Sequence, residues 1–113
     1  MKIEQSQTDG VAVLTPHGSL MGGPDTGELD EKLYQLLNDG YHKVVLDLGR
    51  TDWINSSGIS ILIHHWKKFD SAGASLRMAN LTKKIERILV ISRLSSVFDC
   101  YDTLDQAVAS FKE

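Results

Sequence analysis

Cysteine, proline and long apolar runs are scarce in this sequence. Cys100 is the single cysteine among 113 residues, so no disulfide can form within the chain, and we expect it to be a small packing residue rather than a reactive thiol. No apolar run approaches the about 20 residues that span a membrane, and residues 1–6 carry no apolar signal segment. These absences predict a cytoplasmic protein without direct membrane insertion.

Positive charge is also in short supply. The chain has 12 Lys and Arg residues against 15 Asp and Glu residues, a formal net charge of −3. Proteins that bind nucleic acids usually present a strongly basic face, so we expect no nucleic-acid partner. What the chain does have is 42% hydrophobic residues, which at this length can bury a core. No repeat or linker interrupts the chain, and we expect a single domain over residues 1–113.

Hydrophobic patterning predicts strands that alternate with helices. Residues 1–6 and 11–16 are expected to pair as a hairpin through the Asp9–Gly10 turn, and the apolar run at 43–48 indicates a central strand. A first helix is expected from about Asp25, where Glu28 completes a capping-box pattern, to Gly40. Three more helices are expected, over 56–70, after Thr82, and after Asp102 or Thr103. Short strands are expected at 75–79 and 97–101. The order β-β-α-β-α-β-α-β-α predicts an α/β fold whose central, mixed and mostly parallel sheet of four to five strands is flanked by helices.

The segment after the strand at 43–48 is expected to be a loop over 49–58, and it carries the candidate site. Functional groups in such sheets gather beyond the carboxyl ends of strands. Asn55 is a good N-cap residue, and Ser56 and Ser57 follow it in the first turn of a helix. Backbone N–H groups there lack partners and carry a partial positive charge, so an added phosphate would meet donors. The serines are consistent either with a plain helix cap or with a phosphorylation switch.

The stretch VVLDLGRTDWINSSGISILI, residues 44–63, resembles the signature of STAS domains, named for sulphate transporters and anti-sigma-factor antagonists. That signature is an apolar strand, a loop and Asp-Ser-Ser-Gly-Leu-Gly opening a helix. The resemblance covers nearly the whole chain, because the early Gly18-Ser-Leu20 turn, the Ala-Gly-Ala stretch at 72–74 and the terminal helix fall in register. It implies a STAS fold and the function of an anti-sigma factor antagonist, or anti-anti-sigma factor.

The resemblance also implies a mechanism and a set of site residues. In these antagonists the first serine of the pair, here Ser56, is phosphorylated by an anti-sigma factor that is also a serine protein kinase. The unphosphorylated antagonist holds the kinase and frees the sigma factor, which regulates transcription. Phosphorylation breaks the complex, and a serine phosphatase acting on phospho-Ser56 restores it. The expected partner-binding residues are Asn55, Ser56, Ser57, Gly58 and Ile61, the last because helical spacing places it on the exposed side of the same helix.

Two positions depart from the family pattern. The family usually has an aspartate before the serine pair, where this chain has Asn55, and an aspartate in the early loop, where this chain has Met21. Asparagine retains the helix cap and loses the negative charge. We therefore expect the fold to be kept and the handling of Ser56 by kinase or phosphatase to change.

Other functions can be weighed on the same residues. The alternative to the switch is a STAS subunit of a lipid-transport or sensory assembly that is never phosphorylated. An enzyme with Ser56 or Ser57 as nucleophile would need a Gly-x-Ser-x-Gly elbow and a placed base, so we expect no enzyme and no cofactor. His64 and His65 point about 100° apart on a helix, which is poor for chelating one metal, and both are expected at the surface. Trp53 is expected to pack within the core or its loops.

Overall fold

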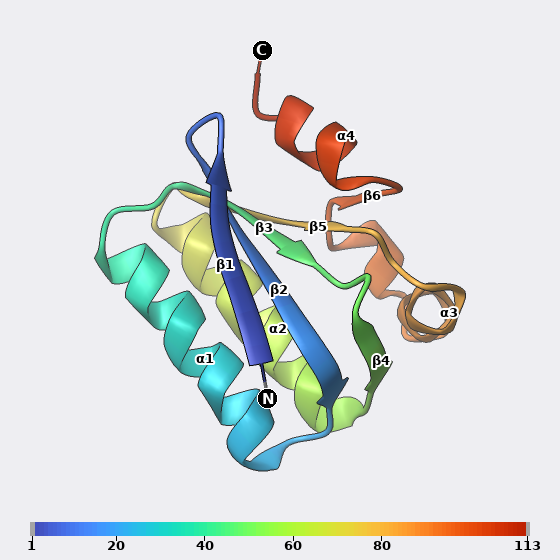
Figure 1. Ribbon diagram of the computed structural model, residues 1–113. Coiled ribbons are helices and arrows are strands. Elements are labelled where there is room, and N and C mark those ends of the chain that lie inside the picture. Colours follow the sequence, from blue (N-terminus) through green and yellow to red (C-terminus); the bar gives the residue numbers. More distant parts are fainter. Residues whose placement is uncertain (1, 113) are drawn as a thin grey trace.

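The sheet begins with an antiparallel hairpin. The computed structural model describes residues 2–112 (Figure 1); Met1, part of the strand predicted at 1–6, and Glu113 lie outside them. Strand β1 (Lys2–Thr8) pairs along its length with β2 (Val11–Leu20). Asp9 and Gly10 have φ angles of 53° and 79°, as a two-residue hairpin turn requires. The predicted hairpin is therefore confirmed.

Strand β2 is longer than the strand predicted at 11–16, and it changes partner along its length. Its first half pairs in parallel with β3 (Lys43–Asp47), and its end pairs in parallel with β4 (Thr51–Ile54). Pro16 falls between these two pairings, so its missing N–H breaks neither of them. The Thr51 hydroxyl donates to the Pro16 carbonyl oxygen at 3.3 Å, at the point where β2 passes from one partner to the other.

Strand β4 lies inside the segment predicted to be a loop over 49–58. Only Thr51 and Ile54 of its four residues are buried, so the apolar pattern of a strand is missing from the sequence. Within residues 2–112 the sheet has six strands in the order β1-β2-β3-β5-β6, with β4 beside β2, instead of the predicted four to five. The predicted α/β class with a mixed, mostly parallel sheet is confirmed.

The remaining elements follow the predicted order. They are the helices α1 (Gly23–Asn38), α2 (Ser56–Ser71), α3 (Lys83–Ile91) and α4 (Leu104–Ala109), the 3-10 turn η1 (Leu94–Ser96), and the strands β5 (Ser75–Ala79) and β6 (Cys100–Tyr101). The strand predicted at 97–101 shrinks to β6, because Phe98 turns inward and packs edge-on against Trp66 with ring centroids 6.4 Å apart.

Helix α1 starts earlier than predicted. Its N-cap is Gly22, whose φ is 86°, and the N–H of Gly22 donates to Thr26 Oγ1 at 2.8 Å. Pro24 stands in the first turn, where its fixed φ suits a helix start. The predicted helix near Asp25 is confirmed with a slightly earlier start, whereas the predicted capping box of Asp25 and Glu28 is wrong, because Gly22 is the N-cap residue.

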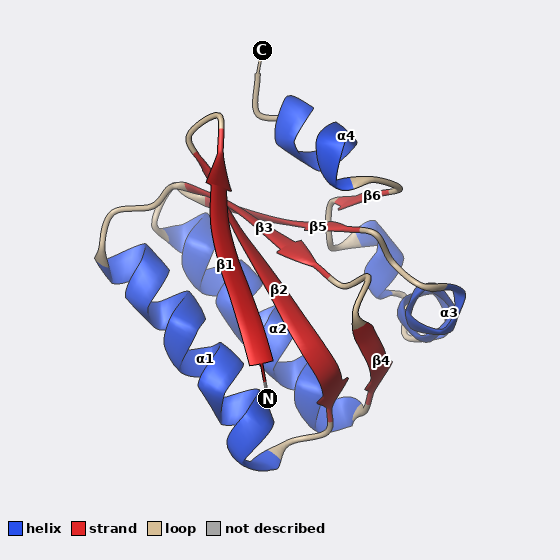
Figure 2. Ribbon diagram, viewed as in Figure 1, coloured by secondary structure: helices blue, strands red, loops and turns tan. Residues whose placement is uncertain are grey.

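The sheet is covered on both faces, unequally (Figure 2). Side chains of α1, α2 and α3 pack with Ala12 and Leu14 of β2 on one face, and the short helix α4 packs with Val11 and Val13 on the other. This alternation follows from the period of two in a strand. No helix of residues 2–112 combines the length and the apolar content that crossing a bilayer requires.

Candidate functional site

The start of α2 is anchored to the end of β2 by Asn55. The Oδ1 atom of Asn55 accepts a hydrogen bond from the N–H of Gly58 at 3.0 Å, which is the predicted N-cap. Its Nδ2 atom donates to the carbonyl oxygen of Met21 at 2.9 Å, and its backbone N–H donates to the carbonyl oxygen of Leu20 at 3.1 Å. One side chain thus caps the helix and ties it to the loop that leads into α1.

Two glycines allow this close approach. A Cβ atom on Gly58 would lie 2.3 Å from the carbonyl oxygen of Leu20, far inside van der Waals contact. A Cβ atom on Gly22 would lie 3.2 Å from the Cβ of Ser57, and its φ of 86° favours glycine in any case. Gly58 is buried, so its part in the site is to let α2 dock against β2.

Both serines of the pair are exposed, in different surroundings. Ser56 is the first residue of the 16-residue helix α2. The side chain of Ser57 lies against Gly22, a residue of the loop between β2 and α1. The first turn of α2 carries no acidic side chain, so the partial positive charge of the helix start has no carboxylate beside it in that turn. A phosphate on Ser56 would therefore stand at an electrostatically favourable position.

Large apolar side chains flank this helix start. Met21 is 49% exposed, and its carbonyl oxygen is bonded to Asn55. Trp53, in β4 two residues before Asn55, is 45% exposed, so the prediction that it packs within the protein is wrong. Ile61, predicted to be exposed, is partly buried. Sequence reasoning missed Met21 and Trp53 as surface residues because apolar residues are expected inside, and only β4 turns Trp53 outward.

The two histidines of α2 lie at the seam with α1. His65 is 1% exposed, and its Nε2 atom is 2.5 Å from Oδ1 of Asp30. Burial lowers the pKa of His65, and the hydrogen bond and charge of Asp30 oppose that shift. His64 is exposed, with Nε2 2.6 Å from the hydroxyl of Tyr34. The prediction of a surface position is wrong for His65, because its ring turns to a carboxylate on the neighbouring helix.

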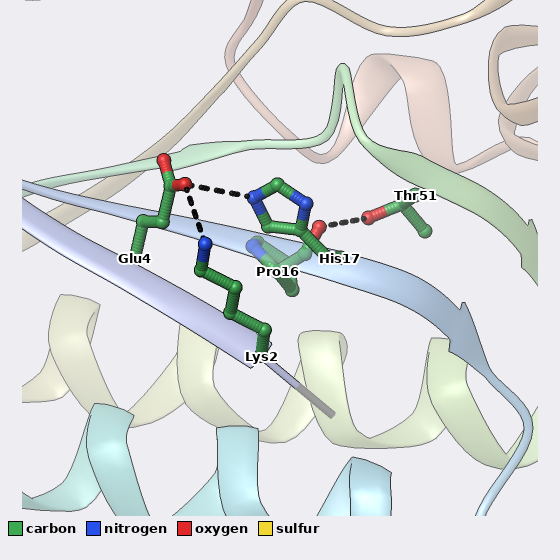
Figure 3. A network of polar contacts seen from close by, with 5 residues as sticks. All are labelled: Lys2, Glu4, Pro16, His17 and Thr51. Carbon is green, nitrogen blue, oxygen red and sulfur yellow. Dashed lines mark hydrogen bonds and ion pairs between the residues drawn. The ribbon is translucent and has the colours of Figure 1, made fainter.

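Two further groups are present elsewhere in the fold. Glu4 on β1 lies 3.6 Å from Nζ of Lys2 and 3.3 Å from Nε2 of His17 on β2 (Figure 3). The Glu4–His17 contact joins the two strands of the hairpin, whereas Lys2 and Glu4 lie on the same strand. The exposed Lys2–Glu4 pair contributes little to stability. Burial raises the pKa of Cys100 to about 11, which keeps the thiol protonated and poorly nucleophilic at neutral pH. Among residues 2–112, no three His, Cys, Asp or Glu residues are grouped so that they could hold a metal ion.

Comparisons with known proteins find similarity in family, in sequence and in fold. A family model described as "STAS domain" matches residues 2–107. A Bordetella bronchiseptica protein named "Putative anti-sigma factor antagonist BtrV" is 27% identical over 112 residues, which cover 99% of this chain and 96% of that protein. A crystal structure of a Thermotoga maritima protein described as "a putative anti-sigma factor antagonist" superposes with a TM-score of 0.90 at 23% identity, covering 98% of this chain and 95% of the other.

A Bacillus protein offers a further likeness in fold. The structure of the "Bacillus Cell Fate Determinant SpoIIAA in the Phosphorylated Form" superposes with a TM-score of 0.74 at 13% identity, covering 98% of this chain and all of the other.

Proposed function

Because this chain belongs to the STAS domain family, we propose that it is an anti-sigma factor antagonist that binds an anti-sigma factor with serine kinase activity and is released when Ser56 is phosphorylated. The observation that carries the proposal is the exposed Ser56 at the first position of α2, on a helix start that Asn55 caps. The name of the Bordetella relative supports the partner class, and the phosphorylated Bacillus protein of the same fold supports the modification.

The proposed docking face surrounds this serine. It comprises Asn55, Ser56, Ser57 and Ile61, with Gly58 as the buried support, and we add Met21 and Trp53 because both are exposed apolar side chains next to the capped turn. Apolar side chains of this size supply much of the free energy when a partner removes them from water. The hydroxyl of Ser56 then lies at the rim of an apolar contact.

The proposed switch reverses the character of that rim. The kinase transfers the γ-phosphoryl group of ATP to Oγ of Ser56, the hydroxyl proton leaves to a base of the kinase, and ADP is the other product. The phosphate adds a charge of about −1.5 to −2. Forcing such a charge into an interface without a counter-ion costs on the order of 3 kcal/mol, which is about a hundredfold in affinity. A serine phosphatase removes the phosphate and restores binding.

The proposal predicts where the phosphate goes and how binding responds. Mass spectrometry after incubation with the kinase and ATP should place one phosphate on Ser56. Without ATP, Ser56→Ala should bind the partner within about fivefold of wild type, because the lost hydroxyl contributes at most about 1 kcal/mol. Phosphorylated protein should bind about a hundredfold more weakly, and Ser56→Asp, with less charge, should show a smaller loss.

Ser57→Ala is the matched control, because Ser57 is also exposed but its side chain lies against Gly22. It should leave both phosphorylation and binding nearly unchanged. Isothermal titration calorimetry of these variants with the anti-sigma factor measures the affinities. Undiminished binding by the phosphorylated protein, or a phosphate on Ser57, would contradict the switch and favour a STAS subunit of a lipid-transport or sensory assembly.

A further inference from the structure

The C-terminal end of α3 holds two neighbouring aliphatic side chains in water. Val90 is 56% exposed and Ile91 is 82% exposed, whereas Ile85 and Leu89 on the inner side of the same helix are fully buried. Apolar residues scattered singly on a surface are ordinary, but contiguous ones mark interaction sites. The side chains of Val90 and Ile91 therefore point away from the core into which Ile85 and Leu89 pack.

Val90 and Ile91 end a continuous stripe along the helix. With Lys83, Glu86 and Arg87 they are spaced i, i+3, i+4, i+7 and i+8, which places all five along one side of α3. The same five residues, which we name the α3 outer face, line a hollow of about 420 Å³. All the residues that line this hollow belong to α3, so it is open to solvent along the helix and leaves room for a partner that lies alongside it.

The charge around this face is opposite in sign to that of the whole chain. The α3 outer face itself carries Lys83 and Arg87 against Glu86, a formal net charge of +1, and Lys84 and Arg93 raise the charge of residues 83–93 to +3. Asp102, which lines a neighbouring pocket together with Glu86 and Val90, adds a carboxylate in that pocket. The chain as a whole has −3. The segment also lies at the side of the molecule away from α1 (Figure 1). A positive, partly aliphatic helix face is complementary to an acidic, partly aliphatic partner.

Two other occupants fit less well. A second copy of the chain, docked by the same face, would bring two faces of net positive charge together, which disfavours that contact. Helices that bind a bilayer surface present protruding Trp, Phe or Leu side chains. The α3 outer face is hollow, its apolar side chains are Val90 and Ile91, and Glu86 lies in its middle. A helix with its own side chains can fill a hollow along α3 by packing ridges into grooves.

We propose that the α3 outer face docks an acidic amphipathic helix of a partner protein, with aliphatic side chains of that helix against Val90 and Ile91 and carboxylates against Lys83 and Arg87. This goes beyond the role of Ser56 and shares no residue with the face around it. The binding is sensitive to ionic strength, because its charged contacts are exposed and screened by salt.

The test uses a synthetic probe and the full chain. A helical peptide of about 18 residues, with leucines on one face and glutamates elsewhere, is titrated into isotope-labelled protein, and amide shifts are followed by NMR. We expect saturable shifts confined to α3 and η1. The same peptide with lysines in place of the glutamates should give none. Ile91→Ser and Arg87→Glu should each weaken binding about tenfold.

Lys67→Glu on α2 is the control for charge reversal, because Lys67 is exposed on another helix, and it should bind like wild type. Ile91 is so exposed that Ile91→Ser leaves the fold intact, which the unperturbed amide spectrum verifies. Shifts mainly outside α3 and η1, equal binding of the lysine peptide, or no saturation at millimolar peptide would overturn the proposal. Cosedimentation with phosphatidylglycerol vesicles in place of peptide binding would assign the face to a lipid surface and overturn it too.

Discussion

At the scale of single residues, His65 shows how burial controls a charge. Its Nε2 atom faces Asp30 on α1, and its Nδ1 atom is buried without a hydrogen-bond partner among residues 2–112. Protonating the ring would leave a buried N–H without an acceptor, which is costly. Burial therefore lowers the pKa of His65 even though Asp30 favours the charged form, and the neutral ring donates from Nε2 to the carboxylate.

This histidine makes stability depend on pH. Because its pKa is lower in the folded chain than in the unfolded chain, the unfolded chain gains the proton first, and folding stability is lost as pH falls below about 6.5. We predict that the free energy of unfolding, from urea titrations, decreases between about pH 7.5 and about pH 5.5. His65→Gln, which keeps an amide donor for Asp30, should lose much of that decrease.

The exposed neighbour provides the matched comparison. His64→Gln should retain the pH dependence of wild type, because its ring is not buried in the seam between α1 and α2. An unchanged slope in His65→Gln would show that other groups cause the dependence.

At the scale of elements, the docking of α2 on β2 depends on one missing side chain. Gly58 lies inside α2, where glycine costs helix stability relative to alanine. Its presence is explained by Leu20, whose carbonyl oxygen would be 2.3 Å from a Cβ atom at this position and whose own Cβ would be 2.9 Å away. The contact involves backbone, which cannot move aside as a flexible side chain can.

Two glycine-to-alanine substitutions should therefore have opposite effects. Gly58→Ala should lower the free energy of unfolding by about 3 kcal/mol, because α2 must shift off the end of β2. Gly27→Ala in α1, where a Cβ atom meets nothing within 4 Å, should raise it by up to about 1 kcal/mol. Urea denaturation of both variants measures the difference. A mild effect of Gly58→Ala would mean that the helix start can move without loss.

At the scale of the whole molecule, the two layers of packing share one sheet. Trp66 packs on the side that α1, α2 and α3 cover, and Val108 of α4 is 5% exposed on the other side. Strands such as β2 contribute side chains to both layers in alternation. Because the same strands supply side chains to both layers, loss of one layer exposes strands that the other needs, and we predict that unfolding is a single cooperative transition.

The substitution Val108→Ala tests whether the two layers unfold cooperatively. Removing two buried methyl groups should lower the free energy of unfolding by about 1–2 kcal/mol. In a Trp53→Phe background, where Trp66 is the single tryptophan, fluorescence reports the opposite layer, and its urea midpoint should shift by the same amount as that of far-UV circular dichroism. Val97→Ala, at a residue 36% exposed, is the control and should shift both little. Separate midpoints for the two signals would show that α4 unfolds on its own.

The amino-acid sequence by itself determined the features that local chemistry controls. The hairpin turn at Asp9–Gly10, the end of α1 at Gly40 and the cap of α2 at Asn55 are confirmed, because each depends on φ preferences or side-chain bonds within a few residues. The continuous apolar run of β3 likewise marks a buried strand wherever it is placed.

Only the tertiary structure decided which residues meet across the chain. The strand β4 exists because β2 offers its end as a partner, His65 is buried because Asp30 of α1 faces it, and Gly58 is required because Leu20 lies against it. Each of these contacts joins residues more than 30 positions apart, so no local pattern carries them. The exposure of Met21 and Trp53 also depends on tertiary structure, because the β2–α1 loop and β4 are brought together at the start of α2.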